Sequence, residues 1–161
     1  MKTIEEPVGG TRTVKIVDYH DVINFAKNLV LEKGDDYKYK DEYGICENFA
    51  GDGDTVGKCI VGRFFASVGL RLHQCGNGDV TGSLQNLATY QEQHPEEDRV
   101  RFTPDAVIAL RIMQINQDDG GTWKTGYMAA EAWLFTRNNL NDAKEFGHSI
   151  TAVIEYGTSE V

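Results

Sequence analysis

Apolar residues recur every three or four positions in several stretches of the chain, which is the spacing of one face of an α-helix. The first predicted helix begins after Asp18 or Asp21, either of which can cap it, and ends at Gly34. Its apolar face is formed by Val22, Phe25, Ala26, Leu29 and Val30.

Four further helices are predicted from the same spacing, over about 58–68, 83–91, 104–116 and 123–138. The clearest start signal is Thr103-Pro104-Asp105, because threonine caps a helix, proline fits its first position and an acidic residue complements the backbone dipole. Residues 106–115 of this helix are nearly all apolar, so we expect it to be covered on most sides.

Residues 11–17 and 149–156 have the alternating, β-branched pattern of short strands. We expect these two strands to pair, since this would bring the chain ends together. The predicted fold class is therefore α+β: a mostly helical single domain of about five helices with a small antiparallel ribbon of N- and C-terminal strands. Residues 1–10 are predicted to be a flexible lead-in, 11–157 the globular domain and 158–161 a tail.

Composition agrees with one domain and adds a constraint on partners. The chain has 161 residues, 40% of them hydrophobic, which is enough for a stable core. Its 25 acidic and 16 basic residues give a net charge of −9, which disfavours direct nucleic-acid binding and suits either solubility or a basic partner. The acidic run that includes Glu96 and Glu97 is predicted to be solvated surface or a docking site for such a partner.

Three cysteines, Cys46, Cys59 and Cys75, form no CxxC pair, and no apolar run approaches the 18 residues of a membrane span. No stretch has the pattern of a signal peptide either. These observations predict a reduced, cytoplasmic protein without membrane association.

Cys59 is a candidate nucleophile because it opens the predicted helix over about 58–68, where the backbone dipole lowers a thiol pKa. His148 stands immediately before the C-terminal strand pattern, an order that resembles papain-like cysteine hydrolases and cell-wall endopeptidases of the same broad fold. The chain departs from that pattern, since only one strand follows His148 and no polar third residue comes after it. We therefore favour Cys59 as a core residue and keep a thiol-dependent hydrolase as the alternative.

The turn Asp118-Asp119-Gly120-Gly121 precedes the last predicted helix. Asp118 and Asp119 can accept the unpaired amides at that helix start, and Trp123 can pack onto the preceding helix. The same three residues would bind a partner if they lined a cleft.

No metal or cofactor is predicted. The segment Asp52–Gly57 resembles the start of a calcium-binding loop, but Val56 stands at the third ligand position and Arg63 stands where the bidentate glutamate belongs. His73 and Cys75 are close in sequence, yet two ligands do not make a zinc site.

Four segments, taken in order, resemble small proteins of actinobacteria and their phages that share a domain of unknown function. They are Cys46, Gly57–Gly62, Phe102–Ala106 and Gln114–Trp123, and the resemblance covers roughly residues 19–135. It implies a helical, cytoplasmic, single-domain protein and a phage or actinobacterial origin, and it implies no activity.

These observations together predict a non-enzymatic accessory protein that binds a protein partner. The alternatives are the hydrolase with its Cys59 and His148 pair, and a virion or self-assembling structural component. The oligomeric state stays open.

Overall fold

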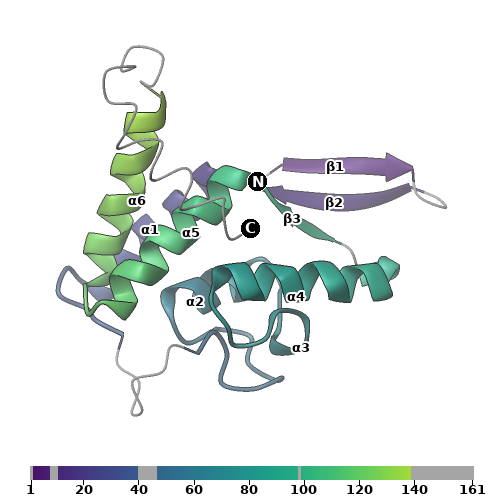
Figure 1. Cartoon of the computed structure of the whole chain (residues 1–161), viewed down its shortest axis with the longest axis horizontal. Helices are drawn as coiled ribbons and strands as arrows, with labels where there is room; N and C mark the ends of the chain where they lie inside the picture. The colour runs from purple at the N-terminus through teal and green to yellow at the C-terminus, as the bar shows by residue number, and fades with distance from the viewer. Residues whose placement is uncertain (1, 8–10, 40–46, 98, 139–161) are drawn as a thin grey trace.

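The computed structural model describes residues 2–7, 11–39, 47–97 and 99–138, and most of these are helical (Figure 1). The α-helices of this part are α1 (Tyr19–Lys33), α2 (Ile60–Ser67), α3 (Leu72–Cys75), α4 (Val80–Gln93), α5 (Pro104–Asp118) and α6 (Trp123–Asn138). A 3₁₀ helix, η1, covers Pro95–Glu97. The strands are β1 (Lys2–Pro7), β2 (Thr11–Val17) and β3 (Val100–Phe102). A mostly helical fold with a small sheet is confirmed.

The sheet has the strand order β1-β2-β3. β1 and β2 form an antiparallel hairpin that projects beyond the helices (Figure 1). β3 runs parallel to β2, with Lys15 opposite Val100 and Val17 opposite Phe102. Each of these two parallel strands leads directly into a helix, β2 into α1 and β3 into α5.

The predicted ribbon is wrong in its partner and its direction. On the side of the helices, β2 pairs with β3, which runs parallel to it. The antiparallel partner of β2 is β1. Because β1 covers Lys2–Pro7, the expectation that residues 1–10 are only a lead-in is corrected for that segment. The predicted C-terminal strand, 149–156, and the predicted tail, 158–161, lie outside the described residues.

Helices with strong local start signals form where they were predicted. Asp18 caps α1 and forms a reciprocal capping box with Asp21. The Asp18 Oδ1 accepts from the Asp21 backbone N–H at 3.1 Å, and the Asp21 Oδ2 accepts from the Asp18 backbone N–H at 2.9 Å. Thr103 caps α5 with Pro104 in its first turn. Thr122 accepts from the Thr125 N–H at 3.0 Å and so caps α6.

The middle helices depart from prediction. α4 begins at Val80, three residues before the predicted start, because Asp79 caps it by accepting from the Gly82 N–H at 2.7 Å. α3 is a single turn inside a segment predicted to be loop, and it buries Cys75.

α5 is the central element and packs against α1, α2, α4 and α6 (Figure 1). Its residues Ala106–Leu110 are all buried, which confirms that the helix is covered on most sides. Buried apolar side chains from β2, β3 and the helices, among them Val17 and Val100, belong to one continuous cluster.

Candidate functional site

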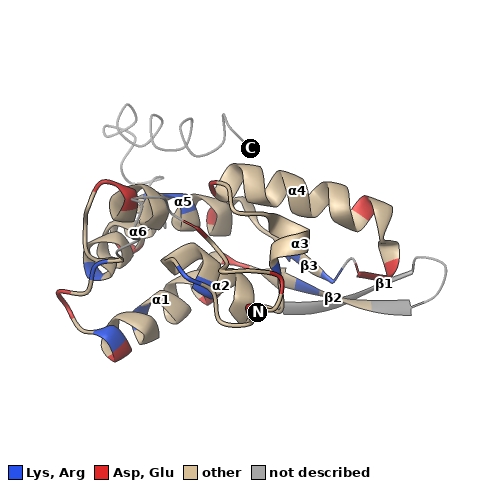
Figure 2. Ribbon diagram, turned by 90° about the horizontal axis from the view of Figure 1, so that it is seen from below, with Lys and Arg blue, Asp and Glu red and all other residues tan. Residues whose placement is uncertain are grey.

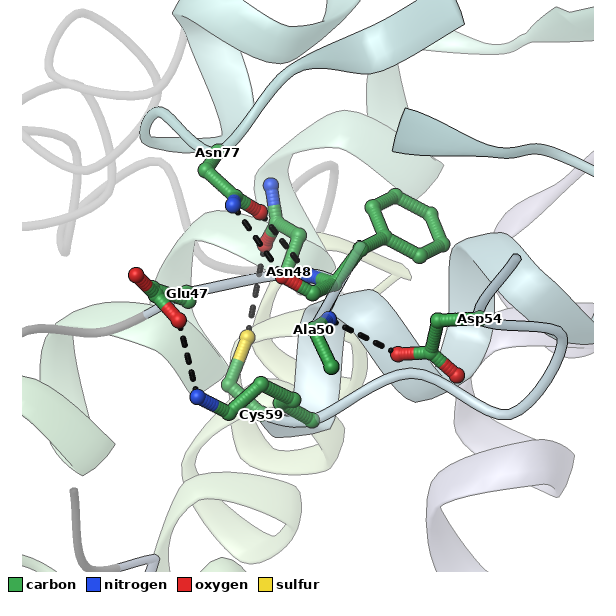
Figure 3. A network of polar contacts seen from close by, with 8 residues as sticks. Glu47, Asn48, Ala50, Asp54, Cys59 and Asn77 are labelled. Carbon is green, nitrogen blue, oxygen red and sulfur yellow. Dashed lines mark hydrogen bonds and ion pairs between the residues drawn. The ribbon is translucent and has the colours of Figure 1, made fainter. Parts of the chain in front are cut away.

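Cys59 lies at the N-cap position of α2, with its thiol in the core. Its side chain is 0% exposed. The Sγ donates to the Asn48 Oδ1 at 3.3 Å and accepts from the Gly62 N–H at 3.4 Å (Figure 3). Both the donor and the acceptor capacity of the thiol are therefore used inside the protein.

Asn48 holds the acceptor of that thiol in place. Its Nδ2 donates to the Ser83 Oγ at 2.9 Å and to the carbonyl oxygens of Gly78 at 3.1 Å and Gly76 at 3.3 Å. The side chain is itself fully buried. Asn48 therefore ties the loop before α2 to the loop between α3 and α4, and it satisfies polar groups that would be costly to bury unpaired.

The loop before α2 is also closed by its own side chains. Asn77 bonds both backbone groups of Phe49, accepting from its N–H at 2.8 Å and donating to its carbonyl at 3.1 Å (Figure 3). Asp54 accepts from the N–H groups of Ala50, Val56 and Gly57. Burial acts to raise the pKa of Asp54, but these N–H donors outweigh it and hold the pKa below its ordinary value. The segment that resembles a calcium loop is a turn closed by Asp54.

Two glutamines of α5 cap the starts of other helices. The Gln117 Oε1 accepts from the Ile60 N–H at 3.1 Å, at the start of α2, and from the Trp123 Nε1 at 2.8 Å. The Gln114 Oε1 accepts from the Val80 N–H at 2.8 Å, at the start of α4. A glutamine side-chain oxygen from α5 therefore accepts a backbone N–H at the start of α2 and another at the start of α4. These N–H groups would otherwise be available to bind an anion.

The predicted partner-binding residues lie in three places, one of which, the position of Trp123, is internal. Trp123 is 1% exposed, and its ring packs on Tyr37 with the centroids 4.5 Å apart, so it has no surface for a partner. Asp118 and Asp119 are exposed at the end of α5.

Glu96 and Glu97 are exposed in η1, just after the end of α4. Because the start of α4 contacts Gln114, near Asp118, the two acidic pairs are separated by the length of α4, about 20 Å. The fold does not bring the two acidic pairs together.

His148 lies outside the described residues, so its pairing with Cys59 stays a prediction. The buried thiol of Cys59 leaves that residue without access to a substrate from solvent. The other buried thiol, Cys75, has its pKa raised to about 12 by burial. Within the described part, His, Cys, Asp and Glu form no group of three that could hold a metal ion.

A groove of about 450 Å³ lies between α4, β3 and the first turn of α5. Its lining is mostly apolar and consists of Leu84, Leu87, Ala88, Gln91, Glu92, Val100, Arg101, Phe102 and Val107. The groove follows the edge of β3 that faces away from β2.

Backbone groups of β3 point toward this groove. In a parallel pair, alternate residues bond the neighbouring strand. Arg99 and Thr103 form hydrogen bonds to β2. The Arg99 carbonyl accepts from the Lys15 N–H at 2.7 Å, and the Thr103 N–H donates to the Val17 carbonyl at 2.9 Å. Val100 and Phe102 therefore direct their backbone groups to the other edge, where the Gln91 Nε2 donates to the Val100 carbonyl at 3.0 Å. The groove combines an apolar lining with an outer strand edge.

Sequence reasoning missed this groove. The helix predicted over about 83–91 includes Leu84, Leu87 and Ala88 of the lining, but a strand of three residues carries too few alternating positions to be recognised. The apolar and polar alternation of Val100-Arg101-Phe102 was the one available signal.

Compared with protein-family models, with curated proteins and with solved structures, the chain matches none of them. The resemblance to actinobacterial and phage proteins therefore stays a prediction. Among the described helices, none is long and apolar enough to cross a membrane.

Proposed function

We propose that the protein is a non-enzymatic accessory protein that binds a protein partner, and that the partner contributes an extended segment to the groove between α4, β3 and α5. The observation that carries this proposal is the apolar groove beside the outer edge of β3. At this edge the Val100 carbonyl already accepts from Gln91, so a partner segment would bond the Phe102 backbone groups and place alternate side chains in the apolar lining, as in domains that bind peptides as an added strand.

The lining favours binding over catalysis. Of the residues in the groove, only Glu92 and Arg101 carry charge, and none is a cysteine, serine, threonine or histidine. A thiol- or serine-dependent hydrolase needs a nucleophile and a base within hydrogen-bond reach of each other, and the groove lining holds neither type of nucleophile. The groove supplies apolar surface and backbone hydrogen bonds, which recognise a segment without changing it.

Charge at one end of the groove indicates which segments fit best. Glu92 lines the groove in the last turn of α4, and Glu96 and Glu97 follow in η1, an acidic end that Figure 2 shows in red. A partner segment with apolar residues at alternate positions and a lysine or arginine at this end complements both features.

Selection from a random peptide library tests this proposal. We expect the enriched peptides to alternate apolar residues and to carry a basic residue. Substituting Ala88→Arg, at an exposed position in the lining, should weaken their binding about tenfold or more, because it fills the groove with a charged side chain.

Thr89→Arg is the matched control, since Thr89 is exposed on the same helix and does not line the groove. It should leave binding within about twofold. A library that yields no binder, or binders that tolerate Ala88→Arg as well as Thr89→Arg, would overturn the proposal.

A further inference from the structure

A smaller pocket lies at the start of α4, the opposite end of that helix from η1. Its volume is about 170 Å³. Two of its polar residues, Asp79 and Thr81, belong to the start of α4. Three more, Arg111, Gln114 and Asp118, follow one another along α5 at intervals of three and four residues. This spacing places the three on one face of α5, so each helix contributes one wall of the pocket.

Arg111 is the cationic group of this pocket. The residue is only 6% exposed, although its guanidinium is charged at every physiological pH. Its Nη1 donates to the Thr81 Oγ1 at 2.8 Å, and this contact with α4 fixes where the guanidinium lies. A guanidinium presents five N–H donors in a planar fork, which binds a carboxylate through two parallel hydrogen bonds. The Arg111 wall therefore suits a ligand carboxylate.

Gln114 adds a hydrogen-bond donor that the described protein does not use. Its Oε1 accepts from the Val80 N–H at 2.8 Å, which fixes the orientation of the side-chain amide. The residue is 5% exposed, and within the part of the chain that the structure describes its Nε2 donates to no acceptor. Buried polar groups are nearly always hydrogen-bonded, so an amide nitrogen left over in a residue that lines a pocket indicates an acceptor on a ligand.

Asp79 and Asp118 give the pocket an acidic rim. Both residues are exposed, and Asp79 caps α4 through its Oδ1, so its Oδ2 is not part of that bond. Gln114 and Asp118 are one helical turn apart, about 5.4 Å along the axis. A ligand that meets both residues must therefore carry its anionic and cationic groups close together, as on a single carbon atom.

The volume of the pocket restricts the ligand to a small molecule. A water molecule occupies about 30 Å³ in the liquid, so roughly six non-hydrogen atoms fill the space, which is the size of alanine. Val80 and Ile115 complete the lining with apolar surface, and this surface suits a methyl side chain.

From these observations we propose that the pocket between the start of α4 and the end of α5 binds a small α-amino acid such as alanine. Arg111 and the Gln114 Nε2 bind the carboxylate of the ligand. Asp79 and Asp118 bind its ammonium group. The ligand contacts both helices at once, and its binding site is separate from the groove that the partner segment occupies.

Titration of the isotopically labelled protein with L-alanine, followed by NMR, tests the proposal. We expect saturable shifts of the Gln114 side-chain amide with a dissociation constant of about 1 mM, which lies within the affinity that a ligand of this size can reach. Acetate carries only the anionic group and methylamine only the cationic one. Each should therefore bind at least about tenfold more weakly than L-alanine.

Asp118→Asn removes one carboxylate of the rim at an exposed position and should weaken L-alanine binding about fivefold. Asp119→Asn is the matched control, because Asp119 is exposed, adjacent in the chain and absent from the lining. It should leave the affinity within about twofold. Arg111→Lys keeps the charge but loses the planar fork, so it should weaken binding about tenfold. Asp118→Asn keeps the test decisive if the Arg111→Lys protein does not fold.

Three results would overturn the amino-acid site. The first is a titration in which the shifts do not saturate. The second is acetate binding as tightly as L-alanine, which would show a site for a carboxylate alone. The third is an equal loss of affinity in Asp118→Asn and Asp119→Asn, because the loss would then follow the overall charge of the protein and not the pocket.

Discussion

At the scale of single residues, the two described cysteines are internal. Cys59 and Cys75 are both 0% exposed, and burial raises the pKa of Cys75 to about 12. Since only the thiolate reacts readily, Cys75 stays protonated and inert at neutral pH, and Cys59 is shielded by its contacts to Asn48 and Gly62.

We expect iodoacetamide at neutral pH to leave Cys59 and Cys75 unmodified in the native protein and to label both after unfolding in guanidinium chloride. Peptide mapping by mass spectrometry identifies which thiol has reacted. Labelling of native Cys59 at the rate of a free thiol would contradict the buried position and revive the hydrolase alternative.

Gly62 makes the closest backbone approach in the site. A Cβ built on Gly62 would lie 1.9 Å from the Asn48 carbonyl oxygen, and backbone cannot rotate away as a flexible side chain can. Gly62→Ala should therefore lower the free energy of unfolding by about 3 kcal/mol, measured by urea denaturation. Gly53→Ala, which meets nothing within 4 Å, is the control and should change it by less than about 0.5 kcal/mol. Equal effects of the two substitutions would contradict the observed packing.

At the scale of elements, the sequence predicted those parts whose signals are local. α1, α5 and α6 carry their own caps at Asp18, Thr103 and Thr122, so their starts could be read from neighbouring residues. β3 could not be recognised, because a strand of three residues forms by pairing with β2, which lies more than 80 residues earlier. The same limit hid the site: Cys59 was correctly placed at the head of a helix, but its acceptor Asn48 lies in a loop without periodicity.

Gln117 makes tertiary hydrogen bonds that no local sequence pattern predicts, since its side-chain oxygen accepts from both the Ile60 N–H at the start of α2 and the Trp123 indole. Gln117→Leu should lower the free energy of unfolding by about 3 kcal/mol, because it leaves the Ile60 N–H and the Trp123 Nε1 buried without an acceptor. Gln93→Leu, at the exposed end of α4, should have little effect in the same urea titration. A Gln117→Leu protein as stable as Gln93→Leu would contradict this capping role.

At the scale of the whole molecule, the net charge is −9, but only some of the acidic residues lie near the proposed groove. Glu92 and Glu96 lie at its acidic end, whereas Asp118 and Asp119 lie about 20 Å away, beyond the opposite end of α4. Glu92→Gln with Glu96→Gln should weaken binding of a basic library peptide about threefold in low salt. Added salt screens these charges and should remove the difference in affinity between the variant and the wild type.

The matched control is Asp118→Asn with Asp119→Asn, which removes the same charge from the distant end. Fluorescence anisotropy at low and high salt checks both proteins. If both double substitutions weaken binding equally, net charge rather than the groove attracts the partner.

The contacts of Asn48 have a consequence for the order of folding. Its side chain bonds residues that are 28, 30 and 35 positions further along the chain, so these bonds require the closure of long loops. Such contacts tend to form after the local helices, and a substitution that removes them then acts on the unfolding rate. Asn48→Ala should accelerate unfolding in stopped-flow measurements and leave the refolding rate nearly unchanged. The loops around Cys59 would thus be the last part of the core to close and the first to open, and Asn48 would set how long the native state lasts.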